Sequence, residues 1–480
     1  MNARRILVPL ATALAAGCDL APKYTRPAAP SGQQPPTAAW KELTPEDYPA
    51  TDGWKQGTPQ DEVMRGSWWE IFGDPLLDEL EREVDAANQG LARASANDRL
   101  ARAAVAQYRA QLFPTLALSP SAMRSWPPGI NCGMTGANCF QLPLEASWEV
   151  DLWGSIRNQV SAASAEAQAT AADLENTRLS LHGQLAVDYF QLRGQDAQRQ
   201  LLDDTVVAYR RALELTRVKH EYGTASSYEV AQAETQLEQT VAQATDLGVS
   251  RAQYEHAIAV LVGKPASGFS IPVEPLHAEP PAVPLGVPSQ LLERRPDIAA
   301  AERRVAEFNA QIGVARAAYF PTLTLSAEAG FATTAIANLF SAPSRFWAFG
   351  ASLAQTLFDG GKRQAQVEQA LAAEEGRVAL YRQAVLTAFQ EVEDHLAAVR
   401  ILSQERQEQR KAVASAERAL ALELDRYGLG LDPYLNVIAA QTTLLSNQRS
   451  ALTIRMEQMT AIAQLIVALG GGWDASRLPH

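Results

Sequence analysis

The hydrophobic period of the chain changes near residue 155. Over residues 140–152 apolar side chains alternate with mostly polar ones, the period of two expected of a strand with two different faces. After Ser155 apolar positions recur every three or four residues, and no proline follows before Pro265. A helix over residues 155–221 would be roughly 100 Å long at about 1.5 Å per residue. The pattern therefore predicts a two-faced strand that leads directly into a rod.

The same order of elements occurs twice. The FPTL sequence at residues 113–116 recurs at 320–323, and the Tyr-Gly pair at 222–223 recurs at 427–428. This period is too long for a stacked solenoid, so we expect an internal duplication. Each copy is predicted to contain a helix, two strands, a long helix, a turn and a returning helix. The expected strands are residues 115–126, 139–153, 321–332 and 345–358, and the expected long helices are 155–221 and 362–427.

Two local patterns concern the helices. Asp74-Pro75 opens a helix that is predicted to continue to about Leu112, just before Pro114. Residues 403–411, inside the second long helix, are all polar. Side-by-side packing of long helices depends on apolar positions about 3.5 residues apart, so this packing is expected to weaken there.

The first residues form a targeting signal rather than part of the fold. Arg4 and Arg5 precede an apolar run that is too short to span a bilayer. Small residues then lead to Cys18, and this arrangement resembles the lipobox of bacterial lipoproteins. We expect residues 1–17 to be a lipoprotein signal peptide and Cys18 to carry covalent lipid. An ordinary cleaved signal peptide is the alternative.

Proline-rich segments flank the repeats. Residues 18–75 are rich in Pro, Gly, Ser and Gln, which predicts an N-terminal anchor and extended arm, with Trp68, Trp69 and Phe72 fixing its end to the body. Seven prolines between Lys264 and Gln290 predict a linker. The resulting organisation is the arm, a first repeat over 76–263, the linker 264–290, a second repeat over 291–470, and a C-terminal tail over 471–480.

Charge and chemistry exclude several function classes. The formal net charge of −12 argues against nucleic acid as a partner, because phosphate binding needs a basic surface. The histidines have no metal-ligand spacing, and no nucleophile elbow or phosphate loop is present. We therefore expect no enzyme activity, no metal and no cofactor apart from the lipid. Cys132 and Cys139 flank a short turn in an exported chain, which predicts a disulfide.

The strands suggest a membrane protein. Four strands of about ten residues, each apolar on one side, fit a membrane β-barrel. Four strands cannot close around a lumen, and an open edge is not tolerated in lipid. Other copies of the chain must then complete the barrel, and three copies would supply twelve strands. A soluble sheet packed on the rods is the alternative.

Several motifs carry a family resemblance. They are residues 21–27 after Cys18, the LERRPDI segment at 292–298 followed by Ala301-Glu302, the segment 312–321, and the closing ALGGGW at 468–473. On these motifs the chain resembles the TolC-like outer-membrane factors, in the lipoprotein branch of efflux channels. The resemblance covers nearly the whole mature chain.

The resemblance implies a fold class and partners. The fold would be an α+β membrane protein whose duplicated unit builds a homotrimer, with a 12-stranded β-barrel continuous with a long periplasmic α-helical barrel. The chain would lie in the outer membrane of a Gram-negative bacterium, in contact with outer-membrane lipid. It would passively conduct drugs, solvents or metal ions received from an inner-membrane pump, of the resistance-nodulation-division type, through a periplasmic adaptor.

The resemblance also assigns roles to the two helical tips. The channel would be gated there, and Leu435 matches a leucine of the family's gate, whereas Ala439 stands where an aspartate is expected. Asp432 and Asp425 are candidate substitutes for that acidic residue. The adaptor-facing tips are expected at Tyr222, Gly223, Thr224, Tyr427, Gly428, Gly430 and Tyr434.

Two other functions are compatible with these patterns. A channel of the same fold could export polypeptides, as in type I secretion. A structural lipoprotein could instead use its rods to tether the envelope. Polar positions on the strands, such as Glu145 and Glu149, favour a wet lumen and argue against a mere tether.

Overall fold

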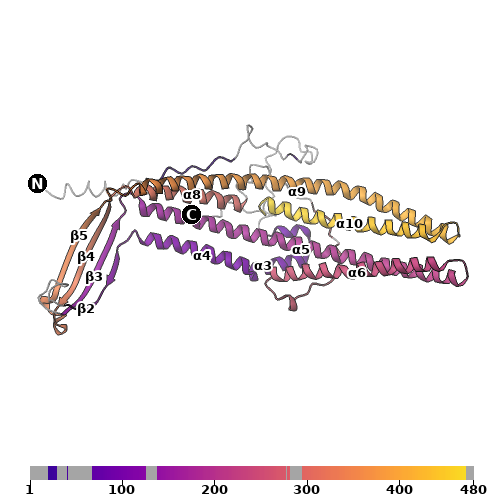
Figure 1. Cartoon of the computed structure of the whole chain (residues 1–480), viewed down its shortest axis with the longest axis horizontal. Helices are drawn as coiled ribbons and strands as arrows, with labels where there is room; N and C mark the ends of the chain where they lie inside the picture. Colours follow the sequence, from indigo (N-terminus) through magenta and orange to yellow (C-terminus); the bar gives the residue numbers. More distant parts are fainter. Residues whose placement is uncertain are drawn as a thin grey trace.

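The computed structural model describes residues 20–29, 41, 67–125, 138–276, 278–281 and 295–471. In these ranges the chain is an elongated rod of helices with a sheet at one end (Figure 1). No helix among the described residues is long and apolar enough to cross a membrane. The principal elements are α3 (Pro75–Ala87), α4 (Gln89–Ala110), β1 (Thr115–Leu118), β2 (Ser121–Arg124), β3 (Asn138–Val150), α5 (Ser155–Glu221), α6 (Ser227–Leu261), α8 (Pro296–Ala317), β4 (Thr322–Thr333), β5 (Arg345–Ala354), α9 (Lys362–Gly428) and α10 (Tyr434–Ala468), with short 3-10 turns at η1 (Trp68–Phe72), η2 (Ala266–Gly268), η4 (Ile336–Asn338) and η5 (Ala342–Ser344).

The helices form a layer whose order follows the sheet. Near the sheet α4 contacts α5, α5 contacts α8, and α8 contacts α9. Toward the far end α6 packs on α5, α5 on α10, and α10 on α9. The two long helices, α5 and α9, run the length of the rod, while α4 with α6 and α8 with α10 fill the remaining positions end to end (Figure 1).

The first predicted helix is divided in two. The sequence pattern predicts one helix from Pro75 to about Leu112, but Asn88 leaves the helical conformation with φ −67° and ψ 123°. Its side chain accepts a hydrogen bond from Leu91 N at 3.0 Å and donates one to Leu261 O at 2.7 Å. Asn88 thus caps α4 and joins the break to the end of α6, a contact with a residue far along the chain that local periodicity does not encode.

The sheet contains the four predicted strands in antiparallel order. β3 lies between β4 and the pair β1 and β2, and β5 lies beyond β4. The strand expected over 115–126 is interrupted, although its register continues, since Leu118 pairs with Leu144 and Ser121 with Gln141. Pro120 and Pro143 fall in the interruption, and neither can donate a backbone hydrogen bond. The strand expected over 345–358 ends earlier, at Ala354.

The register gathers large apolar side chains on one face of the sheet. Leu118 pairs with Leu144, Leu144 with Ala329, and Ala329 with Trp347. Directly opposed residues point to the same face, so these four form one apolar row. Trp347 is 80% exposed in the protomer, which shows that the face is uncovered. Further rows on this face are Leu116, Ala146, Ala327 and Phe349, and Trp148, Leu325 and Ala351.

The other face is polar. Ser147 pairs with Ser326, and Glu145 lies directly opposite Glu328. Two like charges opposed on neighbouring strands are unfavourable unless water solvates them. The sheet therefore has one face suited to an apolar surrounding and one suited to water.

The two corners from strand to long helix are built alike. Asp151 accepts hydrogen bonds from Ile156 N and Arg157 N at 3.1 and 2.9 Å, and its carboxylate pairs with the Arg157 guanidinium. Asp359 accepts from Arg363 N at 3.3 Å in the second copy and pairs with the same side chain. A carboxylate at a helix start satisfies otherwise unpaired N–H groups. The duplication thus repeats the corner as well as the elements.

The end of the arm is buried in the middle of the molecule. Trp68, Trp69 and Phe72 of η1 are at most 6% exposed and belong to the largest apolar cluster, as the sequence predicts. Trp69 stacks on His182 of α5, with ring centroids 4.4 Å apart. His182 Nδ1 lies 2.6 Å from Glu81 Oε2 of α3, so a buried polar pair lies within this cluster.

Candidate functional site

The two helical tips lie together at the end of the rod that is farthest from the sheet (Figure 1). The turn between α5 and α6 uses Gly223 with φ 73°, and the turn between α9 and α10 uses Gly430 with φ 74°. Both conformations are left-handed, which favours glycine at the end of a helix. Ser226 then caps α6 in a reciprocal capping box with Glu229, whereas Pro433 precedes α10 without a side-chain cap.

An ion pair closes the second tip. The Arg426 guanidinium donates to both carboxylate oxygens of Asp432, at 3.2 Å for the Nη2 contact. Hydrogen bonding and charge from Arg426 lower the pKa of Asp432 below its ordinary value. Asp432 is therefore ionised at neutral pH. This gate candidate is paired with Arg426 across the second turn.

The tips are joined to each other through Lys219. Its Nζ donates to Tyr427 O at 3.2 Å and lies 3.7 Å from the centroid of the Tyr427 ring. The Tyr427 ring lies 5.3 Å from that of Tyr434. Burial raises the pKa of Tyr434 to about 12, so its hydroxyl stays protonated at neutral pH. Lys219 thus connects the first helical hairpin, α5 with α6, to the second, α9 with α10.

An apolar cluster lies behind these contacts. Tyr209 and Leu213 come from α5, and Tyr427, Tyr434 and Val437 come from the second hairpin. Ala233 and Leu237 of α6 complete it. This packing fixes the two hairpins near their tips, so moving one hairpin away from the other requires exposing the cluster.

The other predicted tip residues are mostly exposed. Leu435 is 55% exposed on the first turn of α10, and Asp425 is exposed on the last turns of α9. Tyr222 is 81% exposed at the first tip, where Thr224 donates its hydroxyl to Lys219 O. Both Leu435 and Tyr222 keep more than half of their surface uncovered in the protomer, so both are available to another chain.

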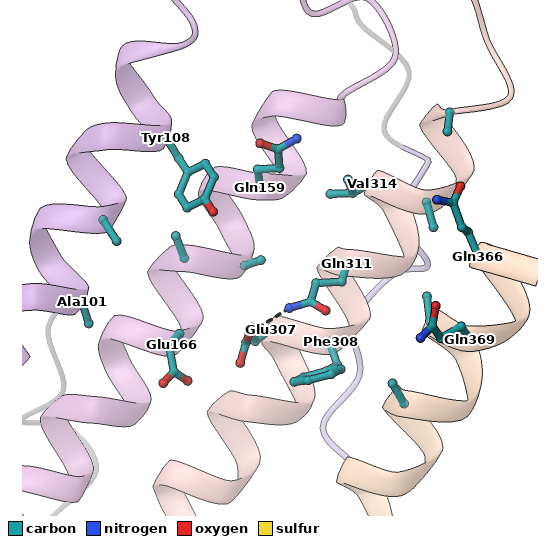
Figure 2. A pocket seen from close by; sticks show the side chains of 17 residues that line it. Ala101, Tyr108, Gln159, Glu166, Glu307, Phe308, Gln311, Val314, Gln366 and Gln369 are labelled. Carbon is teal, nitrogen blue, oxygen red and sulfur yellow. Dashed lines mark hydrogen bonds between the residues drawn. The ribbon is translucent and has the colours of Figure 1, made fainter. Parts of the chain in front are cut away.

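A cavity of about 760 Å³ near the sheet is lined by residues of α4, α5, α8 and α9. Figure 2 shows its lining, with Tyr108 on α4, Gln159 and Glu166 on α5, Gln311 on α8 and Gln366 on α9. Alanines and amide side chains make up most of the remaining wall. The wall therefore combines small apolar side chains with amides and carboxylates, and Tyr108 and Phe308 are its aromatic side chains.

Two carboxylates on this wall influence each other. Desolvation, and the neighbouring Glu166 carboxylate, raise the pKa of Glu307 to about 7. Gln311 Nε2 donates to Glu307 Oε1 at 2.8 Å (Figure 2). The charge of the wall at this level therefore changes around neutral pH.

The predicted lipid and disulfide sites lie largely outside the described residues. Cys18 and Cys132 are not among them. Cys139, at the start of β3, is disulfide-bonded. Its pairing with Cys132 stays a prediction.

Sequence analysis missed two residues of the tip. Arg426 lies six positions before Asp432, and this separation across a Gly-containing turn is a signal that could have identified the pair. Lys219 lies in a polar stretch of a long helix and has no local signal. Its role depends on a residue that lies more than two hundred positions further along the chain.

Comparison with known proteins decides the family. The profile of the outer membrane efflux protein family matches residues 81–264 and 287–471, which is most of the chain and both repeats. The chain belongs to the outer membrane efflux protein family. The family assignment agrees with the resemblance seen in the sequence motifs, and it places the chain among outer-membrane channels rather than enzymes.

Relatives in this family match along nearly the full chain. The solvent efflux pump outer membrane protein SrpC of Pseudomonas putida is 33% identical over 96% of this chain and 97% of its own length. The pyoverdine export outer membrane protein OpmQ of Pseudomonas aeruginosa is 32% identical over 85% of this chain and 88% of its own. The solved structure of the outer-membrane channel OprN superposes with a TM-score of 0.84, at 27% identity, covering 95% of this chain and all of that one.

Proposed function

We propose that this chain is the outer-membrane channel of a tripartite efflux system, which passively conducts small molecules to the exterior. The observation that carries the proposal is the two-faced sheet whose strands β3 and β5 lead directly into the long helices α5 and α9. The apolar face suits lipid and the polar face suits water. We expect the side chains to conduct and gate, and none to do chemistry.

We propose that the working form is a homotrimer with a 12-stranded barrel. Among the described residues β5 pairs only with β4, and β1 and β2 pair only with β3, so the sheet keeps two open edges. Unpaired backbone groups at an edge are costly in lipid, and pairing with other copies removes them. α9 also presents large apolar side chains that are uncovered in the protomer, namely Leu371, Leu380, Leu386 and Ile401.

We propose that lipid on Cys18 enters the membrane at the junction of sheet and rod. The described residues 20–22 of the arm lie along α8, where Asn309 Nδ2 donates to Pro22 O at 2.8 Å and Arg316 Nη1 to Leu20 O at 3.4 Å. Arg316 lies in the last turn of α8, shortly before β4. Residue 18 is two positions from Leu20, so its acyl chains would lie near the sheet. By helical spacing, the arm and the cavity occupy opposite faces of α8.

We propose that the paired tips form the periplasmic gate and the adaptor-facing end. The support is the ion pair of Arg426 with Asp432, the contact of Lys219 with Tyr427, and the exposed Leu435. The partners are a periplasmic adaptor and an inner-membrane pump of the resistance-nodulation-division type. The substrate is of the small-molecule class, and one relative is named for solvent efflux and another for pyoverdine export.

Reconstitution tests the proposal directly. The purified protein in a planar bilayer should insert as a trimer and conduct poorly, and Leu435→Gly should raise its conductance. Deleting the gene should increase susceptibility to solvents or antibiotics. A water-soluble monomer that does not insert into lipid would contradict the channel, and a wild-type pore that is fully open would contradict the gate.

A further inference from the structure

The long helix α9 has a weakly packed region halfway along its length. Its buried residues include Val392 and Leu396 on one side of this region and Ala416 and Tyr427 on the other, and none lies between Leu396 and Ala416. The all-polar residues 403–411 lie in this interval. A helix without apolar anchors resists bending mainly through its own backbone, so this interval is the easiest place for the second hairpin to pivot.

The side-chain contacts that residues 403–411 make to α10 are hydrogen bonds, because this segment has no apolar side chain. Gln409 Nε2 donates to Asn447 O and to Asn447 Oδ1, at 2.9 and 3.0 Å. Gln458 Nε2 donates to Ser403 Oγ at 3.3 Å. Such bonds can be exchanged for bonds to water at small cost, unlike buried apolar contacts.

The segment that follows α6 is fixed firmly to the first hairpin. We call residues 269–281 the strap, of which residue 277 is outside the described residues. Arg193 of α5, only 3% exposed, donates to Pro272 O at 2.8 Å, and Arg251 of α6 donates to Ile271 O at 2.7 Å. Asp196, which is buried, accepts from Glu274 N at 3.1 Å. The first half of the strap is therefore part of the first hairpin.

The second half of the strap reaches the second hairpin at its weakly packed region. Glu279 Oε2 accepts from Arg406 Nη1 of α9 at 2.9 Å, and Glu279 Oε1 lies 3.3 Å from Arg455 Nη2 of α10. Arg455 also donates to Ala278 O at 2.9 Å, and Arg410 lies 3.9 Å from the same carboxylate. Three arginines from both helices of the second hairpin thus converge on one carboxylate.

A small rotation at this contact becomes a large displacement at the tip. Residues 406–428 span about 33 Å at about 1.5 Å per residue, so a rotation of about 10° in the weakly packed region moves the tip by roughly 6 Å. We infer that Glu279 of the strap is a brace that holds the second hairpin in its closed position and that residues 403–411 are the pivot of tip opening. This inference rests on the proposed function, because it assigns a regulator to the proposed gate.

Glu279→Gln tests the brace with little change in shape. The open fraction of the reconstituted channel should rise about threefold or more, and it should depend less on salt, because the charge contact that salt screens is gone. Glu238→Gln is the matched control. Glu238 is exposed on α6, outside the pivot and away from the strap contacts, and its substitution removes the same charge, so it should leave the open fraction unchanged.

Arg406→Gln separates the brace from a general charge effect. It changes net charge in the opposite direction from Glu279→Gln, yet it should also raise the open fraction, and the double variant should add little to either single one. Opposite effects of Glu279→Gln and Arg406→Gln on the open fraction, or equal effects of Glu279→Gln and Glu238→Gln, would overturn the brace.

Hydrogen exchange provides a readout that does not need conduction. Glu279→Gln should speed amide exchange in residues 403–428 of α9 and leave residues 381–396 unchanged. If Lys219→Met at the tip opens the channel while Glu279→Gln alters neither conductance nor exchange, the brace is wrong and the channel stands. If no variant of an inserted protein conducts, the proposed function fails, while faster exchange would still support the brace as a structural contact.

Discussion

Lys219 donates a hydrogen bond to the backbone carbonyl of Tyr427 at 3.2 Å, and its ammonium lies 3.7 Å from the ring of the same residue. This is a contact between two hairpins that occupy equivalent places in the duplicated chain. The two turns of the tip are therefore bonded to each other, because a cation from one repeat contacts a carbonyl and an aromatic face in the other.

Removing the cation should loosen the tip. We expect Lys219→Met to raise the open fraction in planar bilayers by at least about threefold, since a cation–π contact contributes about 0.5–1 kcal/mol even at an exposed site and this one is partly buried. Arg217→Gln is the control. It removes the same positive charge as Lys219→Met, but Arg217 pairs with Glu234 inside the first hairpin. An increase of equal size in both variants would show that net charge, not the contact, sets the conductance.

Gly313 should be needed where the arm lies on α8. A Cβ at this position would lie 2.6 Å from Asn158 Nδ2 and 2.8 Å from Ala21 Cβ, so Gly313→Ala must displace one of them. We expect a loss of about 1–3 kcal/mol in the free energy of unfolding, together with faster proteolysis of the arm in detergent. Gly376→Ala in α9 has open space around it and should be neutral or slightly stabilising. Equal stability of both variants would contradict a tightly docked arm.

Glu81 should make stability depend on pH. Desolvation raises its pKa from 4.5 to about 7, opposed by the hydrogen bond to His182. The pKa of Glu81 is higher in the folded protein than in the unfolded chain. Its contribution to the free energy of unfolding is therefore fully present below pH 4.5 and is lost as the pH rises through 7. Glu81→Gln should remove this loss, up to about 3 kcal/mol at pH 8. Thermal unfolding in detergent at several pH values measures it, and the exposed Glu79→Gln should behave as wild type. A wild-type stability that rises from pH 4.5 to 8 would contradict this sign.

Opposite faces of β5 should tolerate charge differently. Trp347 lies on the apolar face, and we expect Trp347→Arg to cost about 2–4 kcal/mol if that face meets the bilayer core. Ala348 is the next residue and points to the polar face, so Ala348→Arg should be tolerated. The yield of inserted trimer from membrane fractions measures the difference. Equal yields would indicate that the apolar face does not contact lipid.

The sequence by itself determined the repeating plan of this protein. Alternation in period two over residues 140–152, followed by a proline-free stretch of helical period, locates β3 and α5 nearly to the residue, because each period admits one regular structure. The same reasoning located α9, whose polar residues 403–411 marked where packing weakens. The repeat of Tyr-Gly also indicated where the two tips lie, although it pairs Gly223 with Gly428, whereas Gly428 ends α9 and Gly430 is the left-handed glycine of the second turn.

Tertiary structure alone decided which distant residues meet. Asn88, at the break between α3 and α4, meets Leu261 of another helix, and Lys219 serves the second tip because the two hairpins pack together. Glu279 lies in a linker that the sequence marks only as proline-rich, yet three arginines from α9 and α10 surround it. Periodicity records how each residue relates to its near neighbours along the chain. Contacts between elements hundreds of residues apart depend on the packed arrangement, which no local pattern contains.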